Sequence, residues 1–214
     1  SLDVDVPEYT KKLKPELIKG KRVGIVKELM GDGIDKEIRE KITESISKFK
    51  EMGAEIIEIS LPNVKYSIPV YYILATAEAS ANLARYDGVK YGLRESGSKD
   101  ILSMYTKTRQ SGFGQEVKRR IMLGTYALSS GYYDAYYKKA QQVRKLVAQD
   151  FLNAFEKVDL MLSPTCPTTA FEFGAKVADP LSMYMSDIAT VPASLAGLPA
   201  ISLPCGYDSK NLPI

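Results

Sequence analysis

The sequence predicts an α/β fold with a mostly parallel sheet. Short runs rich in β-branched residues alternate with longer segments in which apolar residues recur every three or four positions. The first two such runs, residues 22–28 and 55–59, flank one amphipathic segment, which is the pattern of a βαβ unit. The 214 residues, of which 45% are hydrophobic, are enough to bury a sizeable core.

The first βαβ unit is the clearest part of the pattern. Residues 22–28 form a strand that leads into a turn at residues 31–33. Asp35 is placed to cap a helix, and Gly53 to end it, before the second strand at residues 55–59. The helix should pack on the sheet through a stripe formed by Ile38, Ile42, Ile46, Phe49 and Met52.

The middle of the chain reads as mainly helical. A helix is predicted from Pro69 to Arg85. Residues 91–114 are rich in glycine, serine and threonine, which indicates a loop with a short helical turn near residues 101–105. A long helical stretch follows over residues 115–158, and its length predicts a break at Ser129–Gly131. Its later half carries an apolar face formed by Tyr136, Ala140, Val143, Val147, Phe151 and Ala154.

The last part of the chain returns to short elements. Residues 160–162 form a brief strand that ends in a proline-containing loop. A short helix is predicted over residues 180–189. Residues 200–203, which lie between two prolines, read as another interior strand. Both ends of the sequence look cut, so we expect one partial domain over residues 1–214, incomplete at both ends.

Composition excludes several kinds of chemistry. The chain has no histidine, so a Ser-His-Asp or Cys-His arrangement and a histidine-ligated metal are excluded within it. Twenty-nine Lys and Arg against 26 Asp and Glu leave a net charge of only +3, too balanced for an obligate nucleic-acid coat. Cys166 and Cys205 are expected to be free thiols in a reducing cytoplasm, and small buried residues. No apolar run is long enough to span a membrane.

Few residues could carry chemistry by their local pattern alone. Ser129 and Ser130 precede a glycine but lack the flanking glycines of an oxyanion-binding turn, so we assign no nucleophile there. The glycines form no phosphate-binding motif. Asp187 lies in a stretch of small and apolar residues, where a buried carboxylate would require a cap, an ion pair or a ligand.

Longer segments of the sequence resemble a known family. One reads Gly-Phe-Gly-Gln-Glu-Val-Lys-Arg-Arg-Ile from Gly112, and continues as Gly-Thr-Tyr-Ala-Leu-Ser-Ser-Gly-Tyr-Tyr-Asp-Ala-Tyr-Tyr from Gly124. Residues 78–92 and 187–206 match as well. Together these segments resemble the amidase-signature enzymes, and within that family the A subunits of glutamyl-tRNA(Gln) amidotransferases. The resemblance implies an α/β/α layered fold with a mostly parallel or mixed sheet.

The resemblance also implies a division of roles. The family's Ser, cis-Ser, Lys triad lies upstream of the matched region, so no catalytic residue is expected in this chain. By similarity, the family's glutamine contacts fall on Tyr71, Arg120 and Asp187. Arg120 can bind the α-carboxylate, Asp187 can accept from the α-ammonium, and Tyr71 can add a hydroxyl contact. Two alternatives stay open, because Tyr72 and Arg119 are adjacent to Tyr71 and Arg120.

For the intact enzyme, the resemblance implies hydrolysis of glutamine to supply ammonia for the conversion of Glu-tRNA(Gln), sometimes Asp-tRNA(Asn). It implies B-type and C-type partner subunits in a cytoplasmic heterotrimer. ATP and magnesium belong to the B-type partner, and no cofactor is expected in this chain. These residues alone are expected to be inactive. A fragment of another amidase-signature hydrolase and a non-catalytic binding module are the alternatives.

Overall fold

The computed structural model describes residues 3–31, 33–176 and 179–214. Asp32 of the predicted turn lies outside them. The chain divides into two compact units: Ser1–Lys65 with Val147–Ile214, and Tyr66–Leu146. The prediction of one domain stays a prediction, because compact units can belong to the same domain.

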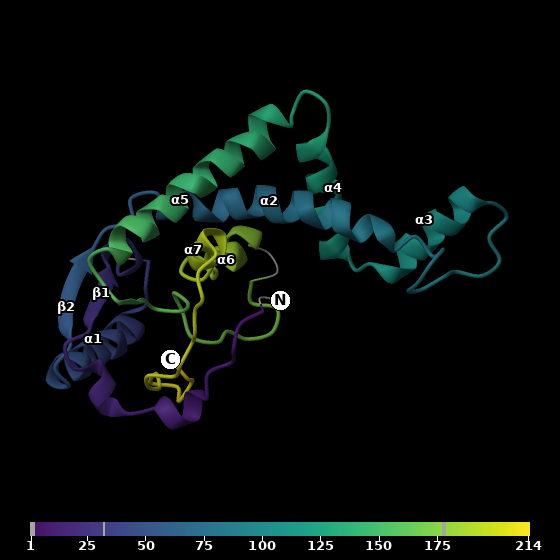
Figure 1. Ribbon diagram of the computed structural model, residues 1–214. Helices are drawn as coiled ribbons and strands as arrows, with labels where there is room; N and C mark the ends of the chain where they lie inside the picture. Colours follow the sequence, from purple (N-terminus) through teal and green to yellow (C-terminus); the bar gives the residue numbers. More distant parts are fainter. Residues whose placement is uncertain (1–2, 32, 177–178) are drawn as a thin grey trace. The chain divides into compact units, whose positions relative to one another are not determined.

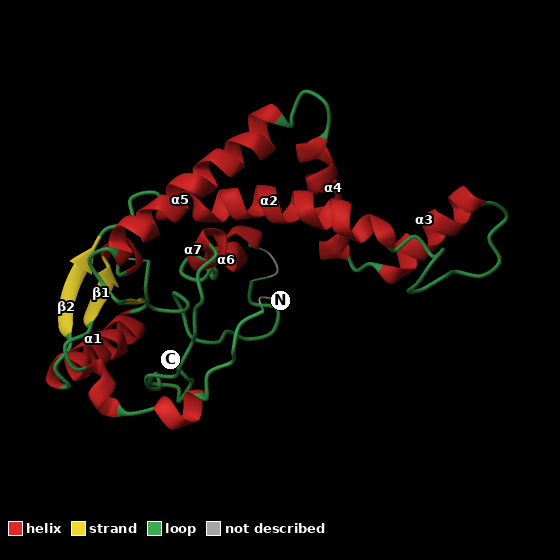
Figure 2. Ribbon diagram, in the orientation of Figure 1, coloured by secondary structure: helices red, strands yellow, loops and turns green. Residues whose placement is uncertain are grey.

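In the described residues, the strands are β1 (Arg22–Val26), β2 (Glu55–Ile59) and β3 (Leu160–Leu162) (Figure 2). The α-helices are α1 (Lys36–Glu51), α2 (Ser67–Asn82), α3 (Ile101–Gly112), α4 (Gln115–Leu128), α5 (Lys139–Phe155), α6 (Pro180–Met185) and α7 (Val191–Ala196) (Figure 1).

The sheet of the first unit is parallel, as predicted, with the strand order β2-β1-β3. Val23 of β1 stands opposite Ile56 of β2 and Leu160 of β3. The β1 and β3 strands are also joined at their beginnings, because the backbone N–H of Arg22 donates to Oδ2 of Asp159 at 2.8 Å. The sequence pattern therefore identified all three strands of the described sheet.

Helices cover both faces of this sheet. Met161 packs against the cluster that contains Val147, Phe151 and Ala154 of α5, whereas the next residue, Leu162, packs against Ile38 and Ile42 of α1. Successive residues of a strand point to opposite faces, so α1 and the end of α5 lie on opposite sides of the sheet. This unit has the predicted α/β/α layers.

The α1 helix follows its predicted pattern except at its ends. Ile38 and Ile42 are buried, as expected for the stripe that faces the sheet. Asp35 occupies the capping position, but its side chain makes no capping hydrogen bond. The prediction for Met52 was wrong: it is 43% exposed, because α1 ends at Glu51 and the chain turns at Gly53, whose φ is 87°.

The second unit is built from α2, α3, α4 and the beginning of α5. The α2 and α4 helices pack closely, and a Cβ atom at Gly124 would lie only 1.9 Å from the carbonyl oxygen of Thr76. The predicted break in the long helical stretch is confirmed, since α4 ends at Leu128 and Gly131 has a φ of 85°. A π-helical turn, Asp134–Lys138, then leads into α5.

The α3 helix is longer than the predicted turn at residues 101–105. It runs over Ile101–Gly112 and begins with a capping box, in which the Asp100 carboxylate accepts from the backbone N–H of Ser103 at 2.7 Å. Arg109 then ties α3 to the end of α2, because its Nη1 donates to the carbonyl oxygen of Leu83 at 2.8 Å. These bonds stabilise a helix whose full length was not predicted from the polar composition of residues 91–114.

Two predictions for the end of the chain were wrong. The helix expected over residues 180–189 ends at Met185, and a separate helix, α7, follows after a turn. Residues 200–203 form no strand: Ile201 is 82% exposed and Leu203 68%. A strand needs a neighbour to pair with, and the described residues provide none here, while Pro199 and Pro204 lack the N–H groups that pairing uses.

Candidate functional site

The structure brings two of the three predicted glutamine contacts, Tyr71 and Arg120, together in the second unit. Tyr71 lies on α2 and Arg120 on α4, the two helices that meet at Gly124. Glycine at this position lets the backbones approach closely enough for side chains one turn away to share one surface. Tyr71, Tyr72 and Arg120 are all half-buried.

Arg120 is held from two directions. Its Nε donates to Oε1 of Glu116 at 3.0 Å, one turn earlier on α4. Its guanidinium carbon lies 5.6 Å from the centre of the Tyr72 ring, which is a cation–π distance. The Tyr72 ring in turn meets Tyr71 edge to face, with ring centres 5.1 Å apart. The pKa of Arg120 is raised, mainly by the hydrogen bond to Glu116 and further by Tyr71, so the guanidinium stays charged.

The neighbouring residue Arg119 has a different environment. It is exposed, and its Nη1 donates to Oε2 of Glu116 at 2.6 Å. Arg120 also contacts Tyr72, so its position favours it over Arg119 as the substrate contact. Arg120, Glu116, Tyr71 and Tyr72 together form a group that we call the Arg120 cluster. The choice between Tyr71 and Tyr72 as the glutamine contact stays open.

The third predicted contact, Asp187, belongs to the first unit. It lies in the turn between α6 and α7, where its backbone carbonyl accepts from the N–H of Val191 at 3.0 Å. Its side chain is half-buried, and the negative charge of its carboxylate raises the pKa of the Cys166 thiol. The turn thus presents a carboxylate, but the assignment of all three residues to one glutamine site stays a prediction.

The cysteines do not form a nucleophilic centre in the described structure. Both are free and half-buried, so the prediction that they are buried was wrong. Burial raises the pKa of the Cys166 thiol and the charge of Asp187 raises it further, while Lys176 opposes both effects. A raised pKa reduces the thiolate fraction that a nucleophile needs.

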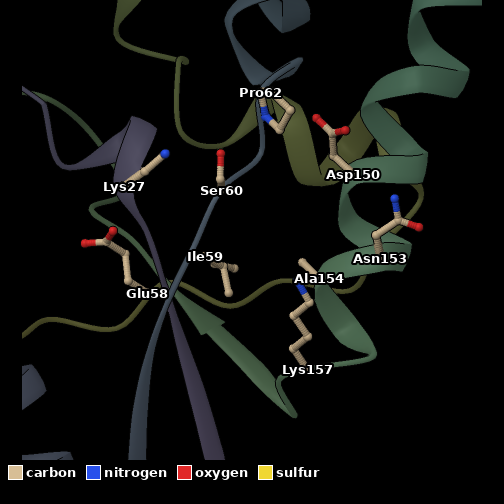
Figure 3. Close-up of a pocket in the computed structure, with 9 residues that line it drawn as sticks. All are labelled: Lys27, Glu58, Ile59, Ser60, Pro62, Asp150, Asn153, Ala154 and Lys157. Atoms are coloured by element: carbon tan, nitrogen blue, oxygen red, sulfur yellow. The ribbon is translucent and has the colours of Figure 1, made fainter.

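The first unit also has a cavity that the sequence did not predict (Figure 3). It has a volume of about 400 Å³ and lies beside the end of β2 and α5. Its lining residues are Lys27, Glu58, Ile59, Ser60, Pro62, Asp150, Asn153, Ala154 and Lys157. Asp150 is engaged with the backbone N–H of Asn63 at 2.7 Å, and none of the predicted glutamine contacts lines the cavity. Its position at the end of a parallel strand, where α/β folds often bind ligands, is a sequence signal that could have found it.

Neither a metal-binding cluster nor a membrane-spanning helix is found in the described part of the chain. Residues 3–31, 33–176 and 179–214 contain no group of three or more Cys, Asp or Glu side chains placed to hold a metal ion. In the same residues, no helix has the length and apolar character needed to cross a membrane.

Comparisons with known proteins agree with the fold and the arrangement of elements. The family model described as Amidase matches residues 1–214. The chain is 60% identical over 214 residues to the A subunit of glutamyl-tRNA(Gln) amidotransferase from a Cyanothece strain, and 58% identical to that of Acaryochloris marina. Each match covers 100% of this chain and 44% of the relative, so the chain spans less than half of their length.

Solved structures give the same result for the fold. The A subunit of the Thermotoga maritima glutamyl-tRNA(Gln) amidotransferase is 37% identical, with a TM-score of 0.67 over 92% of this chain and 37% of that chain. A crystal structure of an amidase, 22% identical, has a TM-score of 0.69 over 91% of this chain and 40% of that chain, which supports the fold alone. The predicted amidase-signature fold is confirmed.

Proposed function

Since this chain belongs to the amidase family, we propose that it is the glutamine-recognising part of a tRNA-dependent amidotransferase subunit. The proposal is supported by relatives at 56–60% identity that are named as A subunits of glutamyl-tRNA(Gln) amidotransferase. Because the chain covers 44% of their length, the proposed activity is that of a longer polypeptide. The same relatives favour this function over another amidase-signature hydrolase or a non-catalytic module.

The main structural support for the proposal is the arrangement of the Arg120 cluster. A half-buried guanidinium beside two tyrosines, with its charge secured by Glu116, suits a planar carboxylate such as that of a free amino acid. Asp187 would accept from the α-ammonium, and Tyr71 would add a hydroxyl contact or a wall. Recognition of both charged ends selects a free amino acid over a peptide.

The reaction itself would use residues outside this sequence. We infer a Ser, cis-Ser, Lys triad there, as the family resemblance implies, which would cleave the side-chain amide of glutamine through an acyl-enzyme and release ammonia. B-type and C-type subunits would complete a cytoplasmic heterotrimer that amidates Glu-tRNA(Gln). ATP and magnesium would bind to the B-type partner. This chain would supply no cofactor ligand and no catalytic group.

Ammonia release from glutamine tests the proposal. A polypeptide of the relatives' full length that contains this sequence, assembled with its partner subunits, should release ammonia. The 214-residue chain alone should release none, because the expected nucleophile is missing from it. If the chain shows a rate, Ser129→Ala and Ser130→Ala variants test whether either serine is responsible, since contamination would be unchanged by both replacements.

Two results would contradict the proposal. One is the absence of glutaminase activity in the assembled full-length protein. The other is a measurable rate in the 214-residue chain that disappears when one of its own residues is replaced.

A further inference from the structure

Glu116 contacts both arginines of the pair at positions 119 and 120. Its Oε1 accepts from Nε of Arg120 at 3.0 Å, and its Oε2 accepts from Nη1 of Arg119 at 2.6 Å. It lies one helical turn before both arginines, so the α4 backbone sets the position of its carboxylate. Both oxygens of Glu116 are therefore engaged within α4.

The bond to Glu116 determines which edge of Arg120 can meet a substrate. A guanidinium can bind a carboxylate through two N–H groups either on its Nε side or at its terminal Nη1–Nη2 end. Glu116 occupies Nε, and the Tyr72 ring lies 5.6 Å from the guanidinium carbon. The Nε side is therefore occupied, which directs an incoming carboxylate to the terminal end.

We propose that Glu116 is a positioning residue that presents the terminal edge of Arg120 to the α-carboxylate of glutamine. The inference rests on the proposed function. A free arginine side chain has many rotamers, and ordering it costs free energy when a ligand binds. Glu116 and Tyr72 restrict Arg120 before glutamine arrives, so less of that cost remains at the moment of binding.

A second effect of Glu116 has the opposite sign. As an anion beside the site, it repels the α-carboxylate and offsets part of the charge of Arg120. Arg119 reduces this repulsion, because it neutralises the other oxygen of Glu116 at 2.6 Å. The Arg119 contact leads us to expect positioning to outweigh repulsion. The two effects predict opposite changes in KM when Glu116 loses its charge.

The test compares variants of the assembled full-length enzyme. Glu116→Gln should raise KM for glutamine by about tenfold, with a smaller change in kcat, because one charge-assisted hydrogen bond to Arg120 is weakened. For a primary amide of similar length that lacks the α-carboxylate, kcat/KM should change far less, since Arg120 has no partner on that substrate. Asp134→Asn is a matched control: it removes another i,i+4 ion pair, to Lys138 at 3.1 Å, and should leave KM unchanged.

The outcomes separate this inference from the proposed function. A lower or unchanged KM for glutamine in Glu116→Gln, together with a raised KM in Arg120→Ala, would overturn the positioning role alone. Equal loss of kcat/KM on both substrates would show that Glu116 acts only on folding, and would also overturn it. If Arg120→Ala leaves the KM for glutamine unchanged, both the inference and the proposed glutamine contact are wrong.

Discussion

Gly124 is the residue at which α4 comes closest to α2. An added Cβ atom would lie 1.9 Å from the carbonyl oxygen of Thr76 and 2.9 Å from the backbone nitrogen of Ala77. These are backbone atoms inside a helix, which cannot move aside as the end of a flexible side chain could. The close approach that supports the Arg120 cluster therefore depends on the absence of a side chain at position 124.

Gly124→Ala should consequently destabilise the protein, although alanine favours an isolated helix more than glycine does. We expect the free energy of unfolding to fall by about 1–3 kcal/mol or more, the cost of overpacking a filled interior. Urea unfolding followed by circular dichroism measures it. Gly112→Ala in α3 is the control, because a Cβ there would meet only a side-chain carbon of Leu93 at 3.5 Å, an ordinary contact, and the change should be small. A Gly124→Ala variant as stable as wild type would show that the helices do not pack this closely.

The sequence alone could not decide whether Arg119 or Arg120 faces the predicted site. Glu116 precedes Arg119 by three positions and Arg120 by four, and both spacings allow an ion pair on a helix. Only the packing of α4 on α2 turns Arg120 towards Tyr72 and leaves Arg119 exposed. Helix phase of this kind depends on tertiary contacts, so the sequence could name the pair but could not choose within it.

Among the elements, β1 and β3 are joined by an ion pair whose strength depends on pH. Arg22 binds Asp159 through Nη2 and Oδ1 at 2.9 Å, and the Asp159 backbone N–H donates to the Arg22 carbonyl oxygen at 2.8 Å. The Arg22 hydrogen bonds lower the pKa of Asp159 to about 2. An unfolded aspartate has a pKa of roughly 3.9. Folding therefore favours the charged carboxylate.

The resulting contribution to stability is fully present above pH 4–5 or so, and is lost as the pH falls towards about 2. Asp159→Asn should lower the thermal midpoint at neutral pH, and the difference from wild type should shrink between roughly pH 4 and pH 2. Thermal melts across this range measure it. Glu40→Gln, which removes an exposed pair with Lys36 at 3.7 Å, should have little effect at any pH. A pH-independent difference for Asp159→Asn would show that the charge of Asp159 does not stabilise the folded protein.

Local patterns predicted some elements better than others. The two strands and the helix of the βαβ segment were predicted correctly, because the strand pattern, most of the stripe of α1 and the turn at Gly53 are all encoded within about 40 residues. The length of the α3 helix was underestimated, because residues 91–114 as a whole are rich in glycine, serine and threonine, and the capping box of Asp100 and Ser103 was not recognised within them. Residues 200–203 have the composition of a strand, but pairing depends on a neighbour that composition does not reveal.

For the whole molecule, the distribution of charge adds to the case for an anionic substrate group. The Tyr66–Leu146 unit carries 13 Lys and Arg against six Asp and Glu, whereas the complete chain has a net charge of only +3. The unit that holds Arg120 is thus much more positive than the rest of the chain, which carries a net negative charge. A field of this sign attracts a carboxylate and becomes weaker as salt is added.

The three predicted glutamine contacts do not all belong to one unit. Tyr71 and Arg120 belong to one, and Asp187 to the other. The sequence could identify these residues only through the family resemblance, because no local pattern links positions 71, 120 and 187. We propose that Arg120 binds the α-carboxylate of glutamine and that Asp187 binds its α-ammonium.

The most direct test is equilibrium binding to the assembled full-length protein, with glutamine and two analogues that each lack one charged end. Wild type should bind both analogues at least about tenfold more weakly than glutamine, since each loses a charged hydrogen bond. Arg120→Ala should lose discrimination against the analogue without the carboxylate, and Asp187→Asn against the one without the ammonium. If each variant discriminates against both analogues as strongly as wild type does, Arg120 and Asp187 do not bind the two ends of glutamine.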